Sequence, residues 1–181
     1  MENQQTPVKA GLNAGLILGI VSVVLTFLIY FISPESLASF STGMVILAIF
    51  LGALIYLGIQ YRKSIGGFMD FGTGFKFAFI ALIIAGLIGI VGNFLLYNVV
   101  DPELPGVLVE AQLETTMAMM ERFGAADAMT PEQMDEIRNS AASNFTLLGQ
   151  LKGFGFALIF YGIVALIVAA IIKKRDKSLD Y

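Results

Sequence analysis

The stretch that decides the fold is Ser64–Pro102, SIGGFMDFGTGFKFAFIALIIAGLIGIVGNFLLYNVVDP. After Lys76 the chain carries no charge until Asp101, and Asp101-Pro102 ends the apolar run. A helix of about 20 apolar residues spans the hydrocarbon core of a bilayer, and proline cannot continue a helix. The stretch therefore predicts a membrane-spanning helix over residues 76–100.

The composition of the whole chain indicates a membrane protein. Of its 181 residues, 57% are hydrophobic and 14% are charged, whereas a soluble domain carries about 25% charged residues. A chain of this size cannot bury so much apolar surface in water, because small domains keep a high ratio of surface to volume. Three further apolar runs predict spans over residues 10–32, 42–61 and 150–172. We expect an all-α membrane protein with four transmembrane helices in a single membrane domain, residues 1–181.

Residues 101–149 differ from the rest in composition, and nine of the fourteen acidic residues fall there. Apolar residues at helical spacing predict an amphipathic helix that ends near Gly124. Thr130-Pro131-Glu132-Gln133 is a helix start, with Thr130 as N-cap and Gln133 completing a capping box. The segment therefore predicts an extracytoplasmic amphipathic helical hairpin between the third and fourth spans. Alternatively, its first half is loosely ordered.

The distribution of basic residues predicts the orientation. Cytoplasmic loops of membrane proteins carry an excess of lysine and arginine. With both termini in the cytoplasm, eight basic residues lie inside and three outside. The inner ones are Lys9, Arg62, Lys63, Lys76, Lys173, Lys174, Arg175 and Lys177, and the outer ones are Arg122, Arg138 and Lys152. We expect a multi-pass protein of the inner (cytoplasmic) membrane with cytoplasmic N- and C-termini.

Small residues recur at helical spacing in the first and third predicted spans. In lipid, such residues let two helix backbones approach closely. The helix-packing candidates are Gly11, Gly15 and Gly19 in the first span and Ala85, Gly89 and Gly92 in the third. The two stripes indicate either that the first and third helices touch or that one of them dimerises.

Polar residues inside the spans are few. Asn93 lies deep in the third span, and Asn13 lies near the start of the first. A buried amide in lipid favours a hydrogen bond to another helix; the alternative is that Asn93 lines a substrate or ion pathway. The glycine-rich approach Ser64–Gly74 is typical of a structured turn between two helices, or else of a gating or lipid-binding loop.

The absence of two residue types common in active sites favours a non-enzymatic protein. The chain has no Cys and no His, which removes the usual transition-metal ligands and the commonest general base. An enzyme acting on lipid would have to use Asp70 or Asp101 with Lys76, and no nucleophile–base set is visible. We predict no catalytic, cofactor-binding or metal-ligating residue, and no nucleic-acid partner.

The functional hypothesis is a non-enzymatic packing, interaction or accessory protein of the membrane, surrounded by lipid. A homo-oligomer and a complex with another membrane protein both stay open. The alternative is a small transporter or channel component, with Asn13, Asn93 and the glycine-rich loop along its path. These patterns name no ligand.

One resemblance rests on specific residues. They are the approach Gly66-Gly67-Phe68-x-x-Phe71-Gly72-x-Gly74-Phe75-Lys76 and the exit Tyr97-Asn98-x-x-Asp101-Pro102. In these motifs, and in the order of its apolar runs, the chain resembles the small bacterial membrane proteins grouped as domain of unknown function 4199. The resemblance covers nearly the whole chain and implies four membrane helices and an inner-membrane location. It implies no reaction, ligand or catalytic residue.

Overall fold

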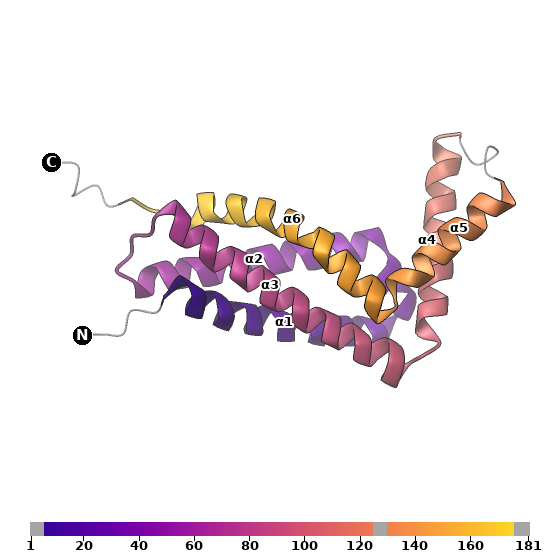
Figure 1. Ribbon diagram of the computed structural model, residues 1–181, viewed down its shortest axis with the longest axis horizontal. Helices are drawn as coiled ribbons and strands as arrows, with labels where there is room; N and C mark the ends of the chain where they lie inside the picture. Colours follow the sequence, from indigo (N-terminus) through magenta and orange to yellow (C-terminus); the bar gives the residue numbers. More distant parts are fainter. Residues whose placement is uncertain (1–5, 125–129, 176–181) are drawn as a thin grey trace. The chain divides into compact units, whose positions relative to one another are not determined.

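The computed structural model describes residues 6–124 and 130–175. Within these residues the chain forms six α-helices and no strand (Figure 1). A 3₁₀ turn, η1 (Pro34–Ala38), follows the first helix, and a π-helical turn, η2 (Leu96–Val100), extends the third. The helices are α1 (Pro7–Ile32), α2 (Phe40–Ser64), α3 (Phe71–Leu95), α4 (Leu104–Arg122), α5 (Pro131–Asn144) and α6 (Leu147–Ile172). The expected all-α class is confirmed.

Among the described residues, four helical segments are long and apolar enough to cross a membrane: α1, α2, α3 together with η2, and α6. Each carries large apolar side chains that are exposed, such as Phe31 and Phe156, with 73% and 78% of their surface accessible. Exposed apolar surface of this extent, on helices of this length, is typical of membrane spans. The chain is therefore a multi-pass membrane protein.

The third span begins at Phe71, five residues before the predicted start at residue 76. Asp70 caps this helix start. One of its carboxylate oxygens accepts a hydrogen bond from the Thr73 backbone N–H (2.9 Å), and the other accepts one from the Thr73 hydroxyl (2.6 Å). Gly72 and Gly74 therefore lie in the first turn of α3. The interpretation of Ser64–Gly74 as a turn is wrong for residues 71–74 and holds for residues 65–70.

Threonine caps begin three other helices. The Lys9 N–H donates to the Thr6 hydroxyl at the start of α1, and the Gly149 N–H donates to the Thr146 hydroxyl at the start of α6. At α5, Thr130 and Gln133 form the predicted capping box. Each side chain satisfies a backbone N–H that the first helical turn leaves without a partner.

Glycines with positive φ end two helices. Gly66 (φ +99°) follows α2, and Gly124 (φ +67°) follows α4 at the predicted position. These φ values fall in a left-handed region that is costly for residues with a Cβ. Glycine therefore ends each of these helices without the cost that a Cβ would add.

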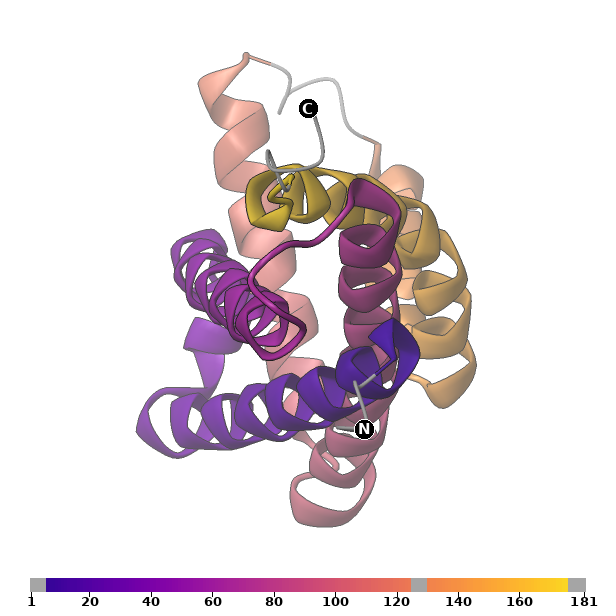
Figure 2. The ribbon, with the colours of Figure 1, turned by 90° about the vertical axis from the view of Figure 1, so that its left-hand side faces the viewer.

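The chain divides into two compact units. Unit 1 comprises Met1–Ser22, Leu47–Gly89 and Phe154–Tyr181, and unit 2 comprises Val23–Ile46 and Ile90–Gly153. Figure 2 shows the segments of α1, α2, α3 and α6 that surround the core of unit 1.

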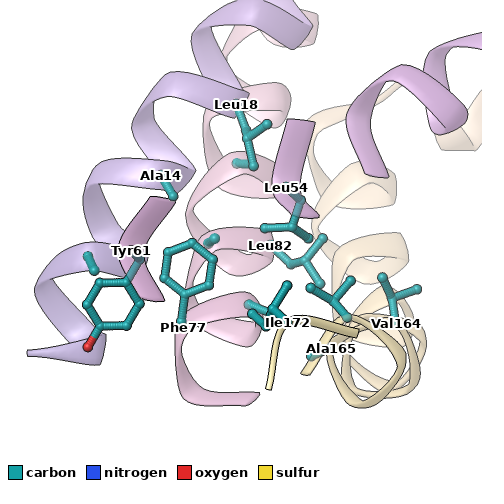
Figure 3. Close-up of a cluster of buried hydrophobic side chains, with 14 of the residues drawn as sticks. Ala14, Leu18, Leu54, Tyr61, Phe77, Leu82, Val164, Ala165 and Ile172 are labelled. Atoms are coloured by element: carbon teal, nitrogen blue, oxygen red, sulfur yellow. The ribbon is translucent and has the colours of Figure 1, made fainter. Parts of the chain in front are cut away.

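Apolar side chains fill the core of unit 1 (Figure 3). Phe77 is 1% exposed, and its ring stacks on that of Tyr61 with 5.3 Å between ring centroids. Leu18, Leu54 and Ile172 bring α1, α2 and α6 into the same cluster. The third span thus packs against the other three spans within unit 1.

Unit 2 contains the helical hairpin. Val109 and Leu113 of α4 pack against Ala141 of α5, with Met134 and Ile137 beside them. Val109 and Leu113 lie four residues apart, in agreement with the predicted amphipathic helix that ends near Gly124. The hairpin of α4 and α5 is therefore present, and residues 104–122 are helical rather than loosely ordered.

Asp101 joins α1 to α4 in unit 2. Its Oδ1 accepts hydrogen bonds from the backbone N–H groups of Glu103 (3.1 Å) and Leu104 (3.0 Å), which lie at the start of α4. Its Oδ2 accepts a hydrogen bond from the Tyr30 hydroxyl near the end of α1 (3.1 Å). Asp101 therefore follows the third span and also links the start of α4 to α1.

Asp101→Ala is expected to loosen the start of α4. The substitution removes a cap worth about 0.5–2 kcal/mol and the Tyr30 hydrogen bond, worth about 1 kcal/mol. Hydrogen exchange of the detergent-solubilised protein should then be faster at Leu104–Leu108. Glu103→Ala is the matched control, because it removes a neighbouring carboxylate that makes no cap hydrogen bond. Equal exchange in both variants would contradict this role.

Candidate functional site

The loop between α2 and α3 is tied to the end of α6 in unit 1. Met69 and Lys174 exchange two backbone hydrogen bonds of 2.9 Å, as in an antiparallel bridge. Arg62, near the end of α2, donates from Nη1 to the Ile172 carbonyl oxygen at 2.7 Å. Residues 62–69 and 172–174, which are far apart in sequence, are thus fixed together.

This arrangement places lysines over aromatic rings. Lys173 Nζ lies 5.9 Å from the centroid of Phe71, and Lys174 Nζ lies 5.6 Å from that of Phe68. Both distances fall within the range of cation–π attraction. The two rings remain 41% and 42% exposed. We call this surface the basic end, comprising Arg62, Lys63, Phe68, Phe71, Lys173 and Lys174.

Asp70 lies beside the basic end and is ionised at neutral pH. The hydrogen bonds from the Thr73 hydroxyl and backbone N–H hold the pKa of the Asp70 carboxyl below its ordinary value. Because the folded-state pKa is lowered, the stabilisation is present above the ordinary pKa of an aspartate. It is lost as the pH falls through the lower folded-state pKa.

The glycine stripe of α1 packs against α3 in unit 1. A Cβ added at Gly11 would lie 2.8 Å from the Phe77 carbonyl oxygen, and one at Gly19 would lie 2.7 Å from Ile88 Cβ. At Gly15 the distances would be 2.6 Å to Ile84 Cβ and 2.7 Å to the Ala81 carbonyl oxygen. The two helices touch, and the glycines receive a row of isoleucines.

The predicted packing residues of α3 lie in different surroundings. Ala85 is buried, whereas a Cβ added at Gly89 would have no atom within 4 Å. In unit 2, Gly92 lies in close contact with the Val23 side chain of α1. The stripe of α3 is therefore not one continuous contact surface.

The two asparagines belong to different units. Asn93, in unit 2, is half-buried, and its side chain makes no hydrogen bond to residues 6–124 or 130–175. The predicted hydrogen bond from Asn93 to another helix is therefore not found among these residues. Asn13, in unit 1, is exposed and lines a cavity of about 240 Å³. The polar residues beside it are Gln60, Tyr61 and Ser64.

Unit 2 carries a larger groove, with a volume of about 720 Å³, between η1, α4 and α5. We call it the hairpin groove. The glutamates that line it are Glu35, Glu110 and Glu114. Apolar side chains lie among them, including Val107, Met117 and Met134. Arg138 forms an ion pair with Glu110 at 3.2 Å, and both side chains are more than half exposed. Such an exposed pair contributes little to stability.

Comparison with known families identifies the chain. The model of the family described as "Protein of unknown function (DUF4199)" matches residues 13–174, which is most of the chain. The chain therefore belongs to this family, as the glycine- and phenylalanine-rich approach and the Asp-Pro exit indicate. No curated protein and no solved structure matches it.

Gly15→Ala is expected to destabilise the protein by about 1–3 kcal/mol, the usual cost of overpacking. The added methyl group would meet Ile84 Cβ and a backbone oxygen, and neither can yield unless a helix moves. Reversible unfolding in detergent would measure the difference.

Gly89→Ala is the matched control, because its added methyl group meets open space. It should be neutral or slightly stabilising, since glycine within a helix costs about 0.5–1 kcal/mol relative to alanine. Equal losses for the two variants would show that the α1–α3 contact does not depend on Gly15.

Proposed function

We propose that this member of the DUF4199 family is a non-enzymatic protein of the inner membrane that acts by binding another protein. The binding surface is the hairpin groove of unit 2, which lies outside the cytoplasm. The partner is a membrane protein or a second copy of this chain, and it presents a segment with both basic and apolar side chains.

The hairpin groove is the observation that carries this proposal. Its glutamates and methionines offer negative charge and apolar contact on one surface. Complementary charge steers association and sets specificity, while buried apolar side chains supply most of the affinity. Methionine adapts to irregular partners because its side chain is flexible and polarisable.

The packing of unit 1 supports an interaction role rather than a conduit. Leu18, Leu54, Phe77 and Leu82 occupy the space between the helices and are at most 4% exposed. Close-packed apolar side chains of this kind stabilise a helix bundle. The hairpin groove, by contrast, is open to a partner.

The alternative, a small transporter or channel component, draws on the cavity at Asn13, which polar and apolar residues line together. Polar groups inside spans mark many transport pathways. Ala14 and Phe77 also line this cavity, however, and both belong to the apolar core. A path through unit 1 would have to displace that core, so we favour the interaction role.

The basic residues support cytoplasmic termini. Arg62, Lys63, Lys173 and Lys174 lie at the ends of α2 and α6 in unit 1, whereas the hairpin is acidic. By the positive-inside rule, the basic ends of the spans face the cytoplasm. The hairpin between the third and fourth spans then faces outward.

Reporter fusions test this topology. Alkaline phosphatase is active only outside the cytoplasm, so it should be active when inserted after Gly124 and inactive when fused after Tyr181. A green fluorescent protein fused at the same two positions should give the opposite pattern. Phosphatase activity at the C-terminal fusion alone would reverse the proposed orientation.

Photo-crosslinking in living cells tests the groove. A photoreactive residue in place of Met117, which lines the groove, should give a discrete protein adduct. The same residue in place of Met119, which is 51% exposed on the same helix, should give none. An adduct of twice the chain mass would identify a homo-oligomer, and any other mass a different protein.

Charge variants sharpen the test. Glu110→Gln combined with Glu114→Gln should lower the adduct yield severalfold, since an exposed charge pair contributes up to about 1 kcal/mol. Glu121→Gln, on the same helix, is the control and should leave the yield unchanged. The absence of any protein adduct at residue 117 would refute the proposed binding role.

A further inference from the structure

We propose that the basic end of unit 1 binds the headgroup of an anionic phospholipid. The ligand is a phosphodiester such as that of phosphatidylglycerol, taken from the leaflet that surrounds the ends of α2, α3 and α6. This site shares no residue with the hairpin groove, and all its residues belong to unit 1.

The first argument is the fixed position of the two lysines. The paired backbone hydrogen bonds between Met69 and Lys174 hold the residues after α6 against the α2–α3 loop. The hydrogen bond from Arg62 to the Ile172 carbonyl oxygen holds the last residue of α6 to the end of α2. Two cations are thus presented by backbone that is already ordered, so less entropy is lost on binding.

The second argument is positive charge that no carboxylate among the described residues pairs with. Within residues 6–124 and 130–175, the one ion pair found is Arg138–Glu110 in unit 2. Asp70 is the nearby acidic residue in the loop, and the Thr73 hydroxyl and backbone N–H engage both of its carboxylate oxygens. Lys173 and Lys174 instead lie over the rings of Phe71 and Phe68, which leaves their charges available to a phosphate.

The third argument is that the lysines and the aromatic rings lie together at the ends of the membrane spans. Phe68 lies just before the third span and Phe71 is its first residue, while the lysines directly follow the fourth. These positions belong to the interfacial region, where headgroups meet acyl chains. A phospholipid offers its phosphate to the ammonium groups and its glycerol and first methylenes to the exposed rings. This combination favours a lipid over a soluble anion.

Lipid binding to the purified full-length chain tests the proposal. Native mass spectrometry in a neutral detergent would compare phosphatidylglycerol with phosphatidylcholine at equal concentrations. The wild-type chain should retain phosphatidylglycerol preferentially. Raising the salt concentration should weaken this preference, because salt screens exposed charges.

Lys173→Gln combined with Lys174→Gln should lower the apparent affinity for phosphatidylglycerol about thirtyfold, since each basic residue near an anionic surface contributes about fivefold. Arg122→Gln combined with Lys152→Gln is the matched control, because it removes two positive charges from unit 2. The control should bind like the wild type. Melting temperatures in phosphatidylcholine micelles would show whether each variant is folded. If a variant does not fold, the comparison of the two lipids with the wild-type chain still tests the proposal.

Three results would overturn the proposal. The first is equal retention of the two lipids by the wild-type chain. The second is an equal loss of affinity in the lysine variant and in the control, which would indicate a general charge effect. The third is competition by glycerol 1-phosphate at the same concentration as the lipid, which would assign the site to a soluble anion.

Discussion

The contact between α1 and α3 is the interaction on which the rest of unit 1 depends. In lipid, helices gain no hydrophobic free energy by associating, so close packing has to hold them together. Gly11, Gly15 and Gly19 remove the Cβ atoms that would keep the backbones apart, and isoleucines of α3 occupy the space. With α1 held in this way, Phe77 of α3 can stack on Tyr61 of α2, while Gly74 approaches Ala169 of α6. The third span therefore contacts each of the other three.

Two acidic residues define the ends of that third span. Asp70 caps its start, and Asp101 follows η2 and binds the first N–H groups of α4. In both places a carboxylate stays at the membrane boundary because it satisfies backbone donors. Asp101 also accepts the Tyr30 hydroxyl, so the beginning of the hairpin is tied to α1 within unit 2.

The sequence predicts those features of the fold that depend on local pattern. The length of the apolar runs gives four spans, and Thr130-Pro131 and Gly124 give the ends of the hairpin helices. The start of α3 was missed because glycines suggested a turn, although Asp70 three residues before Thr73 has the spacing of a cap. Contacts between distant residues could not be predicted, since no local signal pairs Lys174 with Met69 or brings Glu35 to the groove of α4.

The same distinction applies to the candidate sites. Helical spacing marked the glycines of α1, but it could not show that they receive isoleucines rather than the small residues of α3. The sequence separated the basic residues near the ends of the spans from the acidic residues of 101–149, but it could not show which apolar side chains lie beside them. In unit 1 the cations lie beside aromatic rings, and in unit 2 the carboxylates lie beside methionines. The two proposed binding roles therefore rest on different residues, and substitutions can test each of them separately.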